Sequence, residues 1–265
     1  MASESAIISS NKIDQRFESL QSERRKALVC YVTAGHPDRA RSIDLIRGLA
    51  SEGADVIEVG VPFSDPIADG PVIQQSSQQA LAQGMTLNGV FDIVEEARVD
   101  VPVVLFSYLN PLLAGGDGIL RRSREAGIDG ILVTDLPVGA DEERERWLGE
   151  SDLAFIRLVA PTTPLERMKE IASHGSGFVY LISRLGVTGA QESLAQDLPE
   201  TAARLRVATD LPICVGFGVS EPSQAVAAAK VADGVVVGSA IVRAASESLE
   251  KAFTLVRSLR QALDS

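Results

Sequence analysis

The chain has few of the residues that build redox and nucleic-acid sites. Its 265 residues include two cysteines and two histidines, and the net charge is −11. This charge argues against a nucleic-acid partner or an anionic membrane surface, because both attract basic patches. Cys30 and Cys214 each lie inside an apolar run, so we expect buried, reduced thiols rather than a disulfide or a nucleophile.

Long apolar runs are also absent. No stretch reaches the roughly 18 residues that a membrane-spanning helix needs. Residues 1–12, MASESAIISSNK, lack the apolar centre of a signal peptide and read as a polar, flexible start. We therefore expect a cytoplasmic protein that does not bind membranes.

Short apolar runs recur instead, with amphipathic segments between them. A helical spacing of apolar residues over 13–25 precedes the first run, and segments 40–50 and 224–230 show similar patterns. Eight β-then-α units over about 250 residues predict an α/β protein with one (βα)8, or TIM-barrel, domain spanning 1–265 and an extra N-terminal helix. An open doubly wound sheet is the alternative, but no Gly-x-Gly-x-x-Gly follows the first strand. The expected strands are 28–32, 56–59, 103–106, 130–133, 155–159, 178–182, 213–215 and 235–237.

A short sequence motif recurs just before several expected strands. It reads GAD at 53–55, GID at 127–129 and VAD at 231–233. Such short turns between a helix and the next strand are what a repeated βα unit needs.

Two carboxylates stand out near the second expected strand. Glu58 lies inside the apolar run VIEVG, where an ionisable group is costly unless it has a partner or a chemical role. Asp69 follows in a loop rich in Gly, Pro, Ser and Asp. In a (βα)8 barrel the loops after the strands form the active face, so we expect both carboxylates to meet over one substrate. The alternatives are a carboxylate satisfied by its neighbours at Glu58 and a turn-forming residue at Asp69.

Glycine-rich turns follow the last three expected strands, at 186–189, 216–218 and 238–239. Backbone N–H groups can converge there, and a helix that starts after Ser239 adds partial positive charge. We therefore expect a phosphate site that needs no Lys or Arg.

The remaining residues narrow the chemistry. No lysine falls at the active-face end of an expected strand, which disfavours a Schiff base. His36 follows the first strand and His174 lies toward the opposite face, so they cannot readily share a metal, and we interpret His174 as structural or solvated. Acid and base groups remain, namely Glu58, Asp69 and Tyr180. The lysines are Lys12, Lys26, Lys169, Lys230 and Lys251.

These motifs together resemble one family. The loop GVPFSDPIADGP at 60–71, YVTAG at 31–35, Tyr180 followed by SRLGVTG, and the turns GFG and GS are similar to those of the tryptophan synthase α subunit. The resemblance implies a lyase of tryptophan biosynthesis that cleaves indole-3-glycerol phosphate to indole and glyceraldehyde 3-phosphate, a retro-aldol reaction without cofactor or metal on this chain. It also implies an α2β2 heterotetramer with a β subunit that carries pyridoxal phosphate.

The resemblance assigns roles by position. Glu58 matches the general acid and base, Asp69 the carboxylate that stabilises positive charge on the indole nitrogen, and Tyr180 a tyrosine beside Glu58. Thr188 matches a loop residue that closes the site and orients Asp69. The positions that match the indole pocket are Phe106, Leu132 and Phe217, and those that match the phosphate loops are Gly189, Gly218, Gly238 and Ser239.

Two positions depart from the family pattern on the face that would meet a β subunit. His36 stands where the family usually has Asp, and the loop after Asn110-Pro111 lacks an expected aromatic residue. The strength or identity of the partner contact therefore stays open. The alternatives are a stand-alone indole-releasing lyase and a barrel kept as an allosteric partner; a sugar-phosphate isomerase or an indole-forming synthase fits less well.

Overall fold

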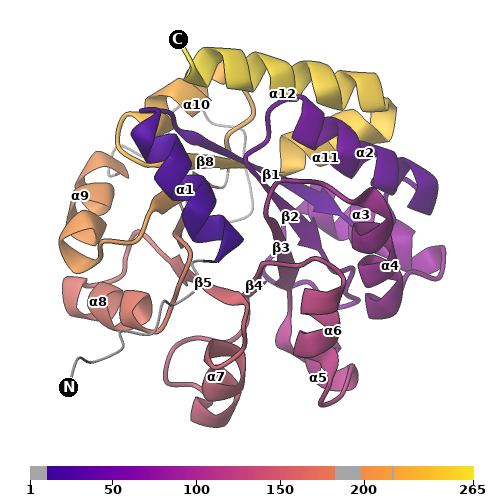
Figure 1. The fold of residues 1–265 in the computed structure, drawn as a ribbon, viewed down its shortest axis with the longest axis horizontal. Helices are drawn as coiled ribbons and strands as arrows, with labels where there is room; N and C mark the ends of the chain where they lie inside the picture. The colour runs from indigo at the N-terminus through magenta and orange to yellow at the C-terminus, as the bar shows by residue number, and fades with distance from the viewer. Residues whose placement is uncertain (1–10, 183–197, 217) are drawn as a thin grey trace, which may run out of the picture.

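In the computed structural model, which describes residues 11–182, 198–216 and 218–265, parallel strands close into a barrel in the order β1 to β8 (Figure 1). Each strand pairs with the next one along the chain, and β8 pairs with β1. The predicted (βα)8 architecture is thus confirmed. The strands are β1 (Ala27–Thr33), β2 (Val56–Gly60), β3 (Val103–Ser107), β4 (Gly130–Val133), β5 (Ala154–Val159), β6 (Val179–Ile182), β7 (Ile213–Gly216) and β8 (Gly234–Val237).

The helices surround the barrel. Several begin at a side chain that accepts a hydrogen bond from the first turn, each such cap being worth about 1 kcal/mol; these N-caps are Asn11, Asp38, Thr86, Asp141 and Ser248. The helices are α1 (Lys12–Ser22), α2 (Arg39–Ser51), α3 (Pro71–Ala82), α4 (Leu87–Ala97), α5 (Leu109–Ala114), α6 (Ile119–Glu125), α7 (Glu142–Gly149), α8 (Leu165–Ser173), α9 (Leu198–Ala208), α10 (Pro222–Ala229), α11 (Ser239–Glu247) and α12 (Leu249–Leu263).

Strand alternation divides the core into two layers. In β1, Val29 and Tyr31 point into the barrel, while Leu28 and Cys30 point outward to the helices. The same period of two runs through the other strands, as expected when one face lines the barrel and the other supports helices. Both layers are apolar, so a charged side chain inside either one is an exception that calls for an explanation.

Helix α1 closes the amino-terminal end of the barrel, the end nearest the viewer in Figure 1. Its buried side chains are Ile13, Phe17 and Leu20. The Phe17 ring lies 5.7 Å from the ring of Phe178, measured between centroids. A Cβ on Gly130 would lie 2.7 Å from the Ile13 side chain, so that glycine leaves room for the helix. The extra N-terminal helix thus acts as a plug, which leaves the opposite end for chemistry.

The ends of α1 differ from the prediction. Lys12, expected in a flexible start, is the first residue of the helix, because Asn11 caps it. The helix ends at Ser22 rather than at Arg25, and Arg24 takes a left-handed conformation with φ of 56°. Hydrophobic spacing does not register such an end, since the apolar stripe stops at Leu20.

The recurrent motif that ends in Asp before alternate strands has a physical cause. The Asp55 carboxylate accepts the N–H of Leu28 at 2.7 Å, and the Asp55 N–H donates to the Leu28 carbonyl at 2.8 Å. We call this reciprocal pair of bonds a strand clamp. Three further strand clamps join Asp129 to Val103, Ser176 to Phe155 and Asp233 to Ile213. Each clamp satisfies a backbone N–H at the start of an odd-numbered strand through a residue that precedes the next strand.

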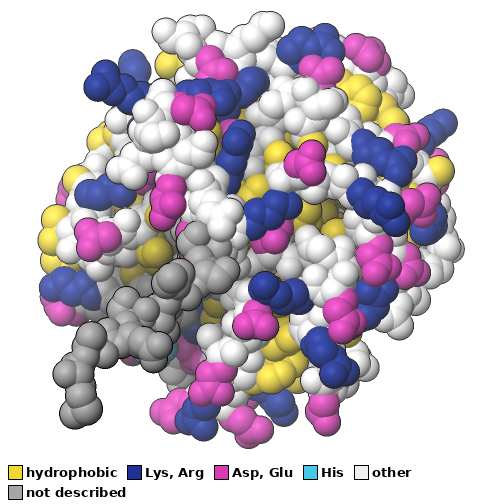
Figure 2. Space-filling view, viewed as in Figure 1, with side chains coloured by type: hydrophobic (Ala, Val, Ile, Leu, Met, Phe, Trp, Pro, Cys, Tyr) yellow, Lys and Arg dark blue, Asp and Glu magenta, His cyan; other side chains and the backbone are white. Residues whose placement is uncertain are grey.

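Acidic and basic side chains are interspersed over the face that carries α1 (Figure 2). Within the described residues, no helix is long and apolar enough to cross a membrane.

Candidate active site

Strand β2 directs Glu58 into the barrel, because its neighbours Ile57 and Val59 belong to the outer layer. The Glu58 side chain is fully buried, and neither carboxylate oxygen has a hydrogen-bond partner among the residues that the structure describes. Burial raises its pKa to about 8, since the ionised form would lose water without gaining a donor. At neutral pH this carboxyl group therefore keeps its proton and can donate it.

Two tyrosines lie in the same interior, each opposite a glycine. Tyr31 is the register partner of Glu58 across β1 and β2. A Cβ on Gly60 would lie 2.1 Å from the Tyr31 hydroxyl oxygen, and a Cβ on Gly216 would lie 2.1 Å from the Tyr180 hydroxyl oxygen. These glycines at strand ends thus make room for aromatic side chains inside the barrel.

Asp69 lies in the loop between β2 and α3, and Tyr108, the residue directly after β3, holds this loop. The Tyr108 hydroxyl accepts the N–H of Ala68 at 2.9 Å, which fixes the residue next to Asp69. Partial burial raises the pKa of Asp69 to about 6, while hydrogen bonding with Tyr108 lowers it. Asp69 is therefore ionised at neutral pH, whereas Glu58 is protonated.

The electrostatics connect the two carboxyl groups. Burial raises the pKa of the Tyr180 hydroxyl most, and negative charge on Glu58 and then on Asp69 raises it further. The Tyr31 pKa is likewise raised first by burial, then by Asp69 and by Glu58. Both carboxyl groups thus act electrostatically on the same two buried hydroxyls inside the barrel, those of Tyr31 and Tyr180.

The predicted phosphate residues of the described chain lie beyond neighbouring strands. Gly218 follows β7 with φ of 97°, a conformation that glycine adopts without strain. Gly238 precedes α11, and Ser239 is the first residue of that helix, directly after β8. The first N–H groups of a helix have no partner within it, so an anion can accept their hydrogen bonds.

Phe106 and Leu132 are buried in the inner layer, on the neighbouring strands β3 and β4. The Phe106 ring packs edge-on against Tyr31 at 5.2 Å between centroids. This gives the site an apolar wall suited to an aromatic ring. Thr188, Gly189 and Phe217 lie outside the described residues.

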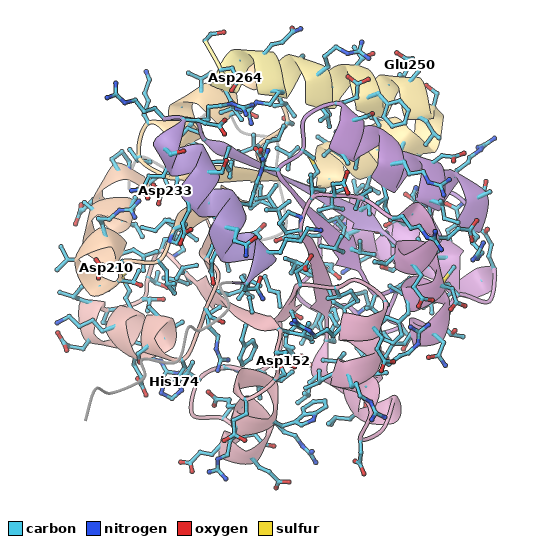
Figure 3. The ribbon with its side chains drawn as sticks, in the orientation of Figure 1. Asp152, His174, Asp210, Asp233, Glu250 and Asp264 are labelled. Atoms are coloured by element: carbon cyan, nitrogen blue, oxygen red, sulfur yellow. The ribbon has the colours of Figure 1, made fainter. Side chains whose placement is uncertain are left out.

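The histidines and cysteines lie apart from this site. His174 is the C-cap of α8, at a half-exposed position on the face seen in Figure 3, in agreement with the structural or solvated role predicted for it. His36 is 5% exposed, and its Nε2 lies 2.8 Å from the Ser246 hydroxyl of α11. Cys30 and Cys214 are free and buried, as predicted. Among the described residues, no group of three or more His, Cys, Asp or Glu side chains could hold a metal.

Sequence reasoning missed Tyr108 as a site residue and did not give Tyr31 a place in the site. Tyr108 follows directly on β3, and a polar aromatic residue at the carboxyl end of a barrel strand is a signal that could have found it. Its link to Ala68 spans 40 residues of sequence, which no local pattern records.

Comparison with known proteins gives a consistent assignment. A family model described as tryptophan synthase alpha chain matches residues 17–264. The tryptophan synthase alpha chain of Desulfatibacillum aliphaticivorans is 48% identical over 242 residues, covering 90% of this chain and 91% of that protein. The tryptophan synthase alpha chain of Caulobacter sp. (strain K31) is 44% identical over 236 residues, covering 88% of this chain and 86% of that protein.

A solved structure shows the same likeness in three dimensions. Tryptophan synthase subunit alpha from Legionella pneumophila str. Paris superposes with a TM-score of 0.86 at 37% identity, covering 97% of this chain and 99% of that one. The sequence match and the structural match both extend over most of the barrel. The chain therefore belongs to the tryptophan synthase alpha chain family.

Proposed function

We propose that this chain cleaves indole-3-glycerol phosphate to indole and glyceraldehyde 3-phosphate, as the α subunit of a tryptophan synthase. The observation that carries the proposal is the Glu58 carboxyl group, fully buried inside the barrel with its pKa raised to about 8, followed on the same βα unit by the loop that holds Asp69. A retro-aldol reaction needs a proton donor at one carbon and a base at a hydroxyl group. It needs no lysine if the substrate itself accepts the electron pair.

Glu58 serves both proton transfers. The protonated carboxyl donates to C3 of the indole ring, which becomes an iminium ion. The bond between C3 and the first glycerol carbon then breaks, its electrons return to the ring, and the ionised carboxylate takes the proton of the hydroxyl on that carbon. Glyceraldehyde 3-phosphate and indole result, and Glu58 ends with its proton restored. A pKa near the working pH suits a group that must give and regain a proton.

Asp69 and Tyr180 support the proton transfers that Glu58 carries out. The Asp69 carboxylate stabilises the positive charge that develops on the indole nitrogen when C3 is protonated, and Tyr108 keeps that carboxylate ionised by hydrogen bonding. Tyr180, buried in the same interior and subject to the charge on Glu58, helps to exclude water from that carboxyl group.

The substrate spans the barrel mouth. Phe106 and Leu132 hold the indole ring, while the backbone at Gly218, Gly238 and Ser239 holds the phosphate. Phosphate binding through main-chain N–H groups is compatible with the acidic character of the whole chain, because it requires no cationic side chain.

A β subunit docks on the same end of the barrel. Ile67, in the loop that carries Asp69, is 83% exposed, and Leu113 of α5 is 39% exposed. An exposed apolar side chain beside a catalytic residue favours a partner surface that can also influence that residue. His36, buried against Ser246, contributes less to such a surface than its position in the sequence indicates. Pyridoxal phosphate belongs to the β subunit in this assembly.

The test is indole release from indole-3-glycerol phosphate by the purified chain, with and without an added β subunit. Turnover should rise with the partner and collapse in Glu58→Gln and in Asp69→Asn. Strong turnover that the partner leaves unchanged would favour a stand-alone lyase, and activity that survives Glu58→Gln would contradict the acid and base role. Partner activation without any turnover of the chain itself would favour the allosteric alternative.

A further inference from the structure

A buried ion pair lies between the barrel and its outer helices, away from the catalytic carboxylates. Arg157 points outward from β5 and is 4% exposed, and Glu145 of α7 is 8% exposed. Arg157 Nη2 lies 2.8 Å from Glu145 Oε2. On the same face of β5, the neighbours Phe155 and Val159 are apolar. Because apolar residues of similar volume often replace a buried ion pair without loss of stability, stability alone does not account for this pair.

Both members of the pair hold the loop between β4 and α7, residues 134–141. Arg157 Nη1 donates to the Leu136 carbonyl at 3.2 Å, and Glu145 Oε1 accepts the Gly139 N–H at 2.6 Å. Arg157 Nε also donates to the His174 carbonyl at 3.0 Å. The guanidinium group therefore fastens the loop to β5 and to the end of α8.

This loop reaches toward the catalytic region through Asp135. Its Oδ1 accepts the Leu109 N–H at 2.7 Å, at the start of α5 and directly after Tyr108. The Tyr108 hydroxyl in turn accepts the Ala68 N–H at 2.9 Å and acts on Asp69 by hydrogen bonding. A run of hydrogen bonds and consecutive residues thus links the ion pair to the Asp69 carboxylate.

We propose that the Arg157–Glu145 ion pair is a positioning device for Asp69, acting through loop 134–141 and Tyr108. Neither residue contacts the reacting atoms. The proposal rests on the function proposed above for the catalytic value of Asp69, but the positioning itself can be measured without turnover.

The measurement has to account for the charged and titratable groups around Asp69 at one end of this link and around the ion pair at the other. The Asp69 carboxylate acts on Tyr108, Tyr31 and Tyr180. At the other end, His174 Nδ1 lies 3.4 Å from Glu145 Oε2, and a His174→Asn background removes that neighbour from the comparison.

The test is a titration of the Asp69 side-chain carboxyl by carbon-13 NMR in the full chain, with the pH profile of kcat/KM measured alongside. The Arg157→Leu/Glu145→Leu double variant removes the loop contacts and leaves an apolar layer. Loss of a hydrogen bond to the ionised form raises a carboxyl pKa, so we expect the Asp69 titration and the acid limb of kcat/KM to move up by about half to one pH unit. Arg157→Lys, which keeps a charge but removes the fork that reaches Leu136, provides a second test in case the double variant does not fold.

Two matched variants distinguish a specific effect on the position of Asp69 from a general loss of stability. Arg260→Leu breaks another buried ion pair, with Asp55 at the α1 end of the barrel, and should leave the Asp69 titration in place. In a Tyr108→Phe background, the double variant should cause no further shift. An unmoved Asp69 titration in the folded double variant, or an equal shift in Arg260→Leu, would overturn the proposal. A wild-type chain without cleavage activity would refute the proposed function while leaving the NMR comparison valid.

Discussion

The buried Glu58 carboxyl should make the protein less stable as the pH rises, and Glu58→Gln should abolish that part of the dependence. The carboxyl keeps its proton in the folded chain up to a pKa of about 8, whereas its ordinary value is 4.5. Between these two values the unfolded state releases a proton that the folded state retains, so stability falls with increasing pH. At about 1.4 kcal/mol per pH unit, the loss approaches 5 kcal/mol by the time the folded carboxyl ionises.

The assay is urea unfolding of the wild type and of Glu58→Gln at several pH values from 5 to 8.5. The substituted glutamine does not ionise, so its own effect on the free energy of unfolding is the same at every pH. Asp69 titrates in both proteins and cancels in the comparison. The slope against pH of the difference between the two free energies of unfolding therefore reports on Glu58 alone. We expect the variant to gain about 1.4 kcal/mol on the wild type per pH unit up to pH 8. Glu250→Gln, at an exposed position of α12 (Figure 3), is the matched control and should follow the wild type. A difference that stays constant across this range would refute the reasoning.

Three further predictions follow from the site and the strand clamps. The pH profile of kcat/KM should form a bell with limbs near pH 6 and 8, because Asp69 must be ionised and Glu58 protonated; a profile flat through pH 8 would contradict these roles. Gly60→Ala should lower the free energy of unfolding in urea by about 1–3 kcal/mol through overpacking against Tyr31. Adding Tyr31→Leu, which removes the facing ring, should restore much of that free energy. Asp129→Ala should cost about 1–3 kcal/mol and speed amide exchange at Val103, whose N–H loses its acceptor; unchanged exchange there would mean that the clamp does not protect β3.

The fold was predictable from the sequence because the barrel repeats a local pattern. Every predicted strand occurs, since a strand buried on both faces reads as a short apolar run wherever it lies in the chain. Helix ends were less predictable: the end of α1 depends on the cap at Asn11 and the backbone at Arg24, which hydrophobic spacing does not record. The motif before alternate strands could be seen in the sequence, but the role of Asp55 as an acceptor for the Leu28 N–H depends on the register between β1 and β2.

The candidate site was predictable where a residue breaks its local pattern. Glu58 is an acid within an apolar strand, and burial gives it the protonated state that this break suggests. Tyr108 does not interrupt an apolar run, so only its position at the carboxyl end of β3 marks it, and its bond to Ala68 joins residues 40 positions apart. Arg157 breaks the pattern of β5, but its partner Glu145 lies on a helix and the carbonyl it holds belongs to a loop, so only the three-dimensional structure connects them.

The strand clamps also bear on how the chain can be divided. Each clamp joins an odd-numbered strand to the even-numbered strand that follows it, as Asp55 joins β1 to β2 and Asp233 joins β7 to β8. A break between β2 and β3 leaves every clamp within one piece, whereas a break between β1 and β2 separates Asp55 from Leu28. The barrel is therefore built of four two-strand modules, and new termini made by circular permutation, or fragments meant to reassemble, are best placed at the module boundaries.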